Sequence, residues 1–327
     1  MTDQPRFNLL DPFANIDLGI ADRADGIKDW ATANRAAIQP FKRTVTEIIQ
    51  GFEAALQSVP SGLMVLMLAL LAWQAAGRRT GILVFVALLA LGFLGPNAWP
   101  LAMTTLAIVL SAVLICAVIG LPLGILAAKS DRFERAIRPV LDTMQTIPAF
   151  VYLVPVVMLV GIGNVSGVIV TIVFALPPLI RLTALGIRQV DTSVVEAARA
   201  FGAGPLQILF KVELPLATST IMAGLNQTIM LSLSMVVIAS MIAVKGLGNE
   251  VLRAMGRLDA GQAIVGGLGI VILAVVLDRI TQGLGQSGRH RGHRHWWQGG
   301  PLGLVLRVLS YPLRRSPVAE ISNTRRN

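Results

Sequence analysis

Five long stretches of this chain contain no charged residue, and this feature constrains the fold more than any other. The stretches are 54–77, 80–128, 143–180, 214–244 and 260–277. Each is at least as long as the roughly 18 apolar residues that indicate a membrane-spanning helix. Helices of a large soluble protein would keep a polar stripe, so that alternative is disfavoured. The sequence therefore predicts an all-α integral membrane protein.

The composition supports this prediction. Only 14% of the 327 residues are charged, whereas a typical soluble domain has about 25%. The net charge of +10 comes mainly from connecting loops and from the tail, 286–327. Basic segments beside membrane spans indicate cytoplasmic retention and attraction to anionic lipid, so no nucleic-acid partner is expected. Cys116 lies within an apolar stretch and is expected to be a buried packing thiol.

Two of the charge-free stretches are too long for one helix. The first breaks at Gly95-Pro96-Asn97 and Pro100, and the second at 161–167, where glycines indicate a turn. About seven transmembrane helices are therefore predicted. They cover roughly 58–77, 81–95, 101–128, 145–161, 166–187, 216–243 and 262–284.

The distribution of Lys and Arg predicts the topology. Basic residues follow the first, third, fifth and seventh predicted helices, whereas the turns at 95–100 and 161–166 contain none. By the positive-inside rule, the N-terminus is extracytoplasmic and the C-terminus cytoplasmic in the cell inner membrane. The first 50 residues lack the apolar core of a cleavable signal peptide. Helical spacing of apolar residues predicts interfacial helices in both the N-terminal segment and the tail.

The most specific pattern lies in the loop between the fifth and sixth predicted helices. Residues 191–215 read DTSVVEAARAFGAGPLQILFKVELP. Ser193 and Glu196 have the spacing of a capping box, which predicts that a short helix starts at Ser193.

The second half of this loop predicts an elbow. Gly202 or Gly204 can adopt the left-handed conformation that ends the first helix. Pro205 suits the first turn of a second helix, and Pro215 is expected to mark the start of the sixth membrane helix. The small side chains of the first helix would let another protein approach its backbone closely.

The loop resembles the EAA loop of ABC-importer permeases. The matching residues are Glu196, Ala197, Ala198, Gly202, Leu214 and Pro215. In that family the loop forms a coupling helix that docks into a cleft on the ATPase subunit. The resemblance therefore implies that these six residues form the ATPase-coupling site, and Glu196 can cap its helix at the same time.

Further stretches resemble permeases of glycine betaine, proline betaine and choline importers. They are 142–155, 232–240, 246–253 and 269–282. Lys245 and the arginine-rich extension depart from that pattern. The resemblance implies a type I ABC-importer permease architecture with four parts. These are an extracytoplasmic amphipathic segment (1–57), two accessory transmembrane helices (58–99), the permease domain with the coupling loop at 191–215 (100–285), and a basic cytoplasmic tail (286–327).

The same resemblance implies a transport subunit and not an enzyme. Its partners would be an ABC ATPase, a periplasmic substrate-binding protein, membrane lipid and a second copy of this chain, since two ATPases need two docking sites. No phosphate-binding Gly-Lys-Ser/Thr loop occurs. The chain is therefore expected to hold no cofactor, and ATP and Mg would bind to the partner ATPase.

Polar residues within the predicted spans are candidates for the translocation pathway. They are Gln145, Asn226, Ser232 and Ser234. Hydrogen bonding between helices is the alternative for each of them, and it is favoured for any single one.

Two other readings stay open. The substrate could be a different small solute, such as an amino acid, and the chain could instead be a secondary transporter. His290, His293 and His295 raise the question of a metal, but neighbouring arginines oppose cation binding. No metal site is predicted.

Overall fold

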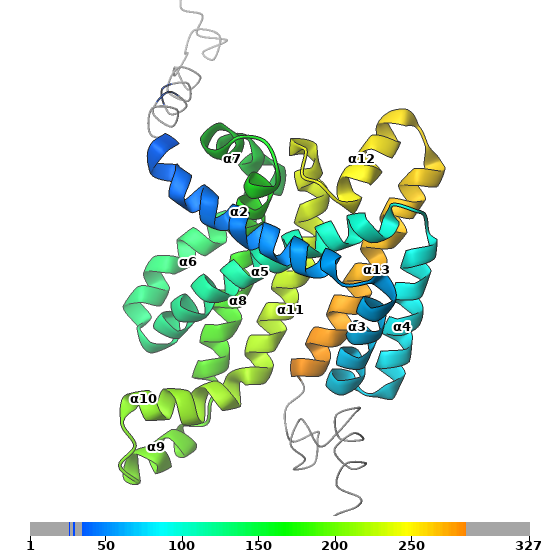
Figure 1. Ribbon diagram of the computed structural model, residues 1–327. Helices are drawn as coiled ribbons and strands as arrows, with labels where there is room; N and C mark the ends of the chain where they lie inside the picture. The colour runs from blue at the N-terminus through cyan, green and yellow to red at the C-terminus, as the bar shows by residue number, and fades with distance from the viewer. Residues whose placement is uncertain (1–25, 27–28, 30–34, 286–327) are drawn as a thin grey trace, which may run out of the picture.

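A computed structural model describes residues 35–285, together with residues 26 and 29, and this part of the chain forms helices and no strands. Figure 1 shows the helices as a tilted bundle. In chain order they are α2 (Arg35–Ser58), α3 (Ser61–Ala76), α4 (Arg78–Phe93), α5 (Ala98–Lys129), α6 (Asp131–Thr146), η2 (Ala149–Tyr152), α7 (Leu153–Val160), α8 (Asn164–Arg188), α9 (Thr192–Ala200), α10 (Pro205–Ile208), η3 (Leu209–Glu213), α11 (Leu214–Ala239), η4 (Ser240–Ile242), α12 (Leu247–Arg257) and α13 (Ala260–Gly285).

Close packing of α5, α8 and α11 forms the centre of the bundle. Small residues permit this approach: a Cβ added at Gly124 of α5 would lie 2.6 Å from the Cβ of Thr183 on α8. A Cβ added at Gly224 of α11 would lie 3.0 Å from the Cβ of Leu182. Thr228 Oγ1 also donates a 3.0 Å hydrogen bond to the carbonyl of Ala175, joining α11 to α8. Such small-residue contacts and interhelical hydrogen bonds are typical of membrane helices.

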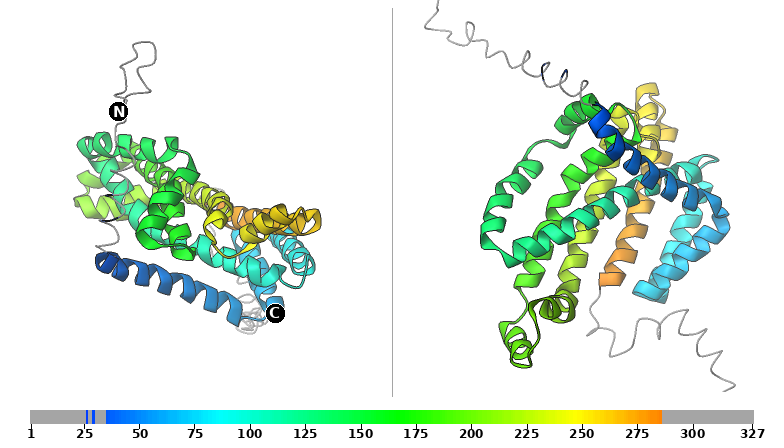
Figure 2. Two further views of the ribbon diagram at one scale, coloured as in Figure 1. Left: turned by 90° about the horizontal axis from the view of Figure 1, so that it is seen from above. Right: turned by 60° about the vertical axis from the view of Figure 1, so that its left-hand side comes forward.

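Two ends of the molecule carry different structures. The α9–α10 elbow and the end of α13 lie at one end, whereas α12 and the long helix α2 lie toward the other (Figure 1). Figure 2 shows α2 running along one side of the bundle. Val45 and Ile49 of α2 are buried, and Lys42 Nζ donates a 2.9 Å hydrogen bond to the carbonyl of Val160. The α2 helix is therefore packed against the bundle.

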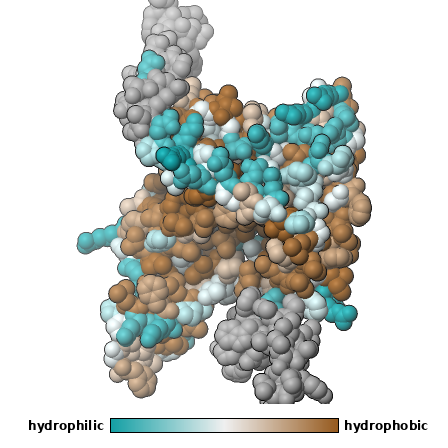
Figure 3. All heavy atoms as spheres, in the orientation of Figure 1, coloured by the Kyte–Doolittle hydropathy of each residue, from teal (hydrophilic) through white to brown (hydrophobic). Residues whose placement is uncertain are grey.

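The number of spans is lower than predicted when helices are judged by length and composition. Among the described residues, four helices are long and apolar enough to cross a membrane, and up to six spans result if each of two bent helix pairs counts as one. The predicted seven include α4, which has only 16 residues and belongs to neither pair. Figure 3 shows a hydrophobic belt between more polar regions.

The fourth predicted span, 145–161, is wrong as a single helix. Helix α6 already begins at Asp131 and ends at Thr146, and it is bent by 101° from the segment Ala149–Val160. Pro148 explains the break, because a residue before proline avoids the helical region, and Ile147 has an extended conformation with ψ 128°. The Ser130 side chain accepts a hydrogen bond from the Phe133 N–H and caps α6. The charged residues of α6 had indicated a loop.

A second prediction needs a similar correction. The region 244–261 was expected to be a loop, but it contains α12, which lies near the same end of the molecule as α2 (Figure 1). One side of α12 is buried through Leu247 and Ala254, whereas Met255 is 63% exposed. This amphipathic pattern is too short to suggest a span from sequence. The predicted tail helix and the three tail histidines lie outside the described residues.

Candidate functional site

The first helix of the 191–215 loop is capped by an aspartate. The carboxylate of Asp191 accepts a 2.9 Å hydrogen bond from the Ser193 N–H, and α9 begins at Thr192. Hydrogen bonds from the Ser193 backbone and hydroxyl hold the pKa of Asp191 below its ordinary value. The prediction that Ser193 caps the helix is therefore wrong. An aspartate two residues earlier supplies the acceptor, and aspartate is equally favoured at this position.

Gly202 forms the bend of the elbow. Its φ is +79°, which side chains with a Cβ rarely adopt. Gly204, the alternative candidate, has φ −72° and precedes α10, where Pro205 is the first residue. The Gln207 side chain accepts a 3.1 Å hydrogen bond from the Gly204 N–H. The two short helices therefore meet at an ordered turn.

The second helix of the elbow continues into the membrane helix. Residues Pro205–Ile242 form one candidate span, with the π-helical turn η3 inserted before α11. Pro215 has no N–H to donate to the carbonyl four residues earlier. The Leu214 N–H instead donates to the carbonyl of Leu209, five residues back. Pro215 lies in the first turn of α11 (Leu214–Ala239), which confirms that it marks the start of the sixth predicted membrane helix.

The six residues of the predicted coupling site lie on two parts of this loop. Glu196, Ala197 and Ala198 belong to α9, and Gly202 lies at the bend. Leu214 and Pro215 lie at the base of α11. Glu196, Ala197 and Pro215 are exposed, and Ala198 and Leu214 are partly exposed. They share one protruding structure, but they do not form a single cluster.

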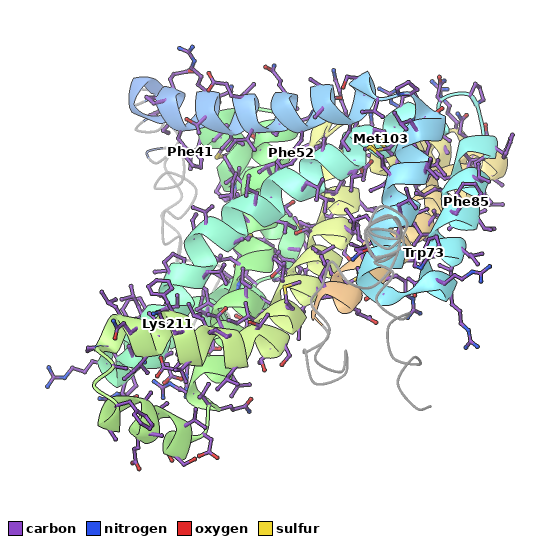
Figure 4. The ribbon with its side chains drawn as sticks, turned by 60° about the horizontal axis from the view of Figure 1, so that its bottom comes forward. Phe41, Phe52, Trp73, Phe85, Met103 and Lys211 are labelled. Carbon is purple, nitrogen blue, oxygen red and sulfur yellow. The ribbon has the colours of Figure 1, made fainter. Side chains whose placement is uncertain are left out.

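Large apolar side chains project from the same elbow. Phe201 is 92% exposed, Leu206 70% and Phe210 63%. Their neighbour Lys211 is labelled in Figure 4, on the helix that leads from the elbow into α11. Exposed apolar clusters typically mark interaction surfaces. The motif did not single out these three residues. Their signal in the sequence is the presence of aromatic and aliphatic residues in a loop that also carries charge.

A charged cavity of about 240 Å³ lies between the elbow and the bundle. Glu196, Arg199 and Glu213 line it from the elbow side, and Lys129 and Arg188 line it from the ends of α5 and α8. Glu213 accepts a hydrogen bond from Lys129 Nζ within an ion pair. The cavity therefore lies between the exposed α9 helix and the ends of α5 and α8.

Arg188 holds three groups near the start of this loop. Its Nη2 lies 2.7 Å from Asp131 Oδ1 and 2.9 Å from Glu134 Oε2. The same nitrogen donates a 2.8 Å hydrogen bond to the carbonyl of Ala127. These contacts tie the end of α8 to the corner between α5 and α6.

A second group of charges lies between α6 and α8, beside a cavity of about 400 Å³. Arg181 Nη2 lies 2.5 Å from Asp142 Oδ1, and Arg181 Nη1 donates a 2.8 Å hydrogen bond to Gln145 Oε1. Leu141 is the only buried residue of α6. The attachment of α6 therefore combines these polar contacts with apolar packing of Leu141, Ile137 and Met144 against the core.

The four pathway candidates are not brought together. Gln145 pairs with Arg181, as described above. Asn226 donates a 3.0 Å hydrogen bond to Asp278 Oδ1 and accepts one from Thr281, which joins α11 to α13. Ser232 is buried and donates to the Thr228 carbonyl at 2.8 Å. Ser234 is exposed and donates to the Met230 carbonyl at 3.2 Å. Asn226 therefore connects helices, as the favoured alternative predicted.

Comparison with known proteins gives consistent matches. Residues 120–289 match the family described as "Binding-protein-dependent transport system inner membrane component". The "Glycine betaine/proline betaine transport system permease protein ProW" of Escherichia coli (strain K12) is 56% identical over 302 residues, which cover 92% of this chain and 85% of that protein.

A more distant relative covers a similar region. The "Glycine betaine transport system permease protein OpuAB" of Bacillus subtilis (strain 168) is 42% identical over 275 residues, covering 84% of this chain and 97% of that protein. An inward-facing structure of the MetNI methionine ABC transporter has a TM-score of 0.49 and 24% identity, and the match covers 55% of this chain and 92% of that chain.

Proposed function

The chain belongs to the family of binding-protein-dependent transport system inner membrane components, and from this premise we propose its substrate and mechanism. The substrate class is quaternary amines such as glycine betaine, proline betaine or choline, imported at the expense of ATP. The observation that carries this proposal is the 56% identity to a glycine betaine/proline betaine permease over 92% of the chain. The match confirms the resemblance inferred from the loop and the four flanking stretches.

The elbow is the element through which ATP would act. Its protruding position and its exposed apolar side chains, Phe201, Leu206 and Phe210, fit a docking contact with an ATPase subunit. ATP and Mg would bind to that subunit, and this chain would carry out no bond chemistry. Closure of two ATPases would displace two elbows and switch the bundle between inward-open and outward-open states. Two docking sites require two copies of this chain, so the importer core would be a homodimer.

The elbow end of the molecule is assigned to the cytoplasm. Arg78 and Arg79, at the turn between α3 and α4, lie at the elbow end of the bundle (Figure 1). Lys129 at the end of α5 and Arg188 at the end of α8 also lie beside the elbow. Such a concentration of basic residues favours the cytoplasmic side. This orientation places α2 and α12 outside, where a periplasmic binding protein would deliver the substrate.

The pathway would be completed between two copies of the chain. Gln145 and Ser234 remain candidates for its lining, since both are partly or fully exposed. Ser232 and Asn226 have hydrogen-bond partners within the chain, so we assign them to helix packing. Selective recognition is assigned to the binding protein, because aromatic residues that could hold a quaternary ammonium group are few in the central spans.

Uptake of labelled glycine betaine and choline tests the proposal. The chain is expressed with its ATPase and binding protein in cells that lack their own betaine systems, with an ATPase-dead partner as the control. We expect uptake that the dead ATPase abolishes. ATP-dependent uptake of another solute alone, such as an amino acid, would overturn the substrate class. Uptake that persists with the dead ATPase would indicate a secondary transporter.

A further inference from the structure

Glu213 is the only acidic or basic residue that is buried among residues 38–285. It is 6% exposed and lies in the π-turn η3, where the elbow meets α11. A carboxylate in such a place is costly unless a positive charge and hydrogen bonds compensate it. The compensating group is Lys129 Nζ, from the last residue of α5. The ion pair joins residues 84 positions apart.

Ion pairs lie at both ends of the 191–215 loop. Glu213 lies at the end of the elbow, and Arg188 precedes its beginning. Arg188 binds Asp131 and Glu134. Both ends of the loop are therefore tied by charges to one structure, which we term the α5–α6 corner (residues 127–134). Between these two ties, the elbow borders a cavity of about 240 Å³, and Leu209 packs with Ile187 of α8 beside the end of α5.

The exposure of the two ties differs. In one tie the side chain of Glu213 is 8% exposed and that of Lys129 44%. In the other, Arg188 is 36% exposed, and its partners Glu134 and Asp131 are 27% and 80% exposed. Solvent screens exposed ion pairs strongly, and most contribute little. Of the carboxylates in the two ties, Glu213 is therefore the most buried and depends most on its partner. Because η3 continues without interruption into α11, the pair also connects α5 to the base of that helix.

We propose that the Lys129–Glu213 ion pair is the joint that transmits displacement of the elbow to α5 and α6. The inference rests on the proposed function, in which an ATPase moves the elbow. Lys129 and Glu213 act as positioning residues: they contact neither substrate nor ATP. The elbow and the α5–α6 corner move as one unit, and the pair stays closed throughout the transport cycle.

The first test measures coupling in the complete complex. The chain is reconstituted into liposomes with its ATPase and binding protein, and ATP hydrolysis is measured with and without loaded binding protein. Lys129→Met and Glu213→Ala should each lower this stimulation at least five-fold, while the subunits still copurify. The charge exchange Lys129→Glu with Glu213→Lys should restore at least half of it. Arg79→Ala removes an exposed charge near the start of α4, away from the proposed binding-protein face, and should leave stimulation unchanged.

The second test asks whether the joint stays closed. In a Lys129→Cys and Glu213→Cys variant, a short reversible bis-methanethiosulfonate linker replaces the ion pair. Cys116 is buried, and the chain without new cysteines is the labelling blank. The linked chain should show ATPase stimulation, and reduction of the linker should remove it. An inactive linked chain that regains activity on reduction would overturn the proposal, because the two residues would then have to separate.

The remaining outcomes are also decisive. Full ATPase stimulation in both single variants would contradict the proposed joint. So would a lack of stimulation in both the charge-exchange variant and the linked chain. Failure of the proposed function is distinguishable, because the unsubstituted complex would then show no stimulation by the binding protein. A wrong substrate class alone would abolish glycine betaine uptake in the unsubstituted complex.

Discussion

The backbone N–H of Leu247 donates a 2.9 Å hydrogen bond to Oγ1 of Thr105, across 142 positions of the sequence. This contact joins the first residue of α12 to the buried part of α5. Gly246 permits it: its φ is +121°, and a Cβ there would lie 2.4 Å from the same hydroxyl oxygen. The neighbouring Lys245 N–H donates a 2.9 Å hydrogen bond to Asn164 Oδ1. Three helices, α5, α8 and α12, therefore meet at this end of the molecule.

Replacing Thr105 by valine should destabilise this junction. The substitution keeps the shape but leaves the buried Leu247 N–H without an acceptor, which costs about 1–3 kcal/mol. Thr105→Ser keeps the hydroxyl and is the matched control. Unfolding in mixed micelles should show this loss of stability for Thr105→Val and a smaller loss for Thr105→Ser. Equal stability of the valine variant and the wild type would contradict the assignment.

Gly202 and Gly204 provide a matched pair for the elbow. Valine at Gly202 must adopt φ +79°, and left-handed conformations cost a residue with a Cβ about 1–2 kcal/mol. Valine at Gly204 meets an ordinary φ of −72° and open space. Gly202→Val should therefore strongly reduce uptake with normal membrane insertion, and Gly204→Val should be much milder. Similar uptake by both variants would argue against the strained turn.

Gly124 tests the close contact of α5 and α8. A Cβ there would lie 2.6 Å from the Cβ of Thr183 and 3.0 Å from the Ile180 carbonyl. Overpacking of this kind typically costs about 1–3 kcal/mol, so Gly124→Val should lower the unfolding temperature of the purified chain. Gly92 has no atom within 4 Å of an added Cβ, and Gly92→Val is the control. A larger loss at Gly92 would refute the packing argument.

The cap of α9 should respond to acid. The pKa of Asp191 is lowered by hydrogen bonds from Ser193, so the ionised cap stabilises α9 fully above the ordinary pKa of 3.8 and loses this effect as the pH falls through the lower folded value. Asp191→Ala should speed amide exchange in α9 by the same factor throughout pH 5–8. Asp191→Asn retains an acceptor and should exchange more slowly than the alanine variant. If the ratio of exchange rates between Asp191→Ala and the wild type varies within pH 5–8, another titratable group must contribute.

Arg181 should influence the attachment of α6. Its pairs with Asp142 and Gln145 are exposed, and exposed pairs contribute less than about 1 kcal/mol each. Arg181→Met removes both pairs and should therefore raise amide exchange in α6 by up to about thirty-fold, and high salt should reduce the difference from wild type. Arg43→Met, which removes an exposed pair on α2, should leave α6 unchanged.

The loop at 191–215 illustrates how much of a local structure the sequence pattern can predict. Glu196, Ala197, Ala198, Gly202, Leu214 and Pro215 carry the resemblance to the family. Gly202 or Gly204 was expected to adopt the left-handed conformation, because few other residues adopt it readily. Three details of the loop depend on which groups form hydrogen bonds in the folded chain. They are the choice between these two glycines, the cap at Asp191 and the π-turn before α11. The spacing of residues in the sequence does not specify this hydrogen-bond pattern.

The sequence by itself determined that this chain is a helical membrane protein of one transporter family. Long apolar segments are stable only when they are removed from water, and the motif at 191–215 consists of residues that lie close together in the sequence. Both features can therefore be recognised without the tertiary structure. Only the tertiary structure decided which polar residues meet. Lys129 and Glu213 are 84 positions apart, and Asn226 donates a hydrogen bond to Asp278, 52 positions away. The tertiary structure also decided that α6 ends at Thr146 and that the chain bends by 101° before the next helical segment. These features follow from the relative placement of helices, which the local periodicity of each segment leaves open.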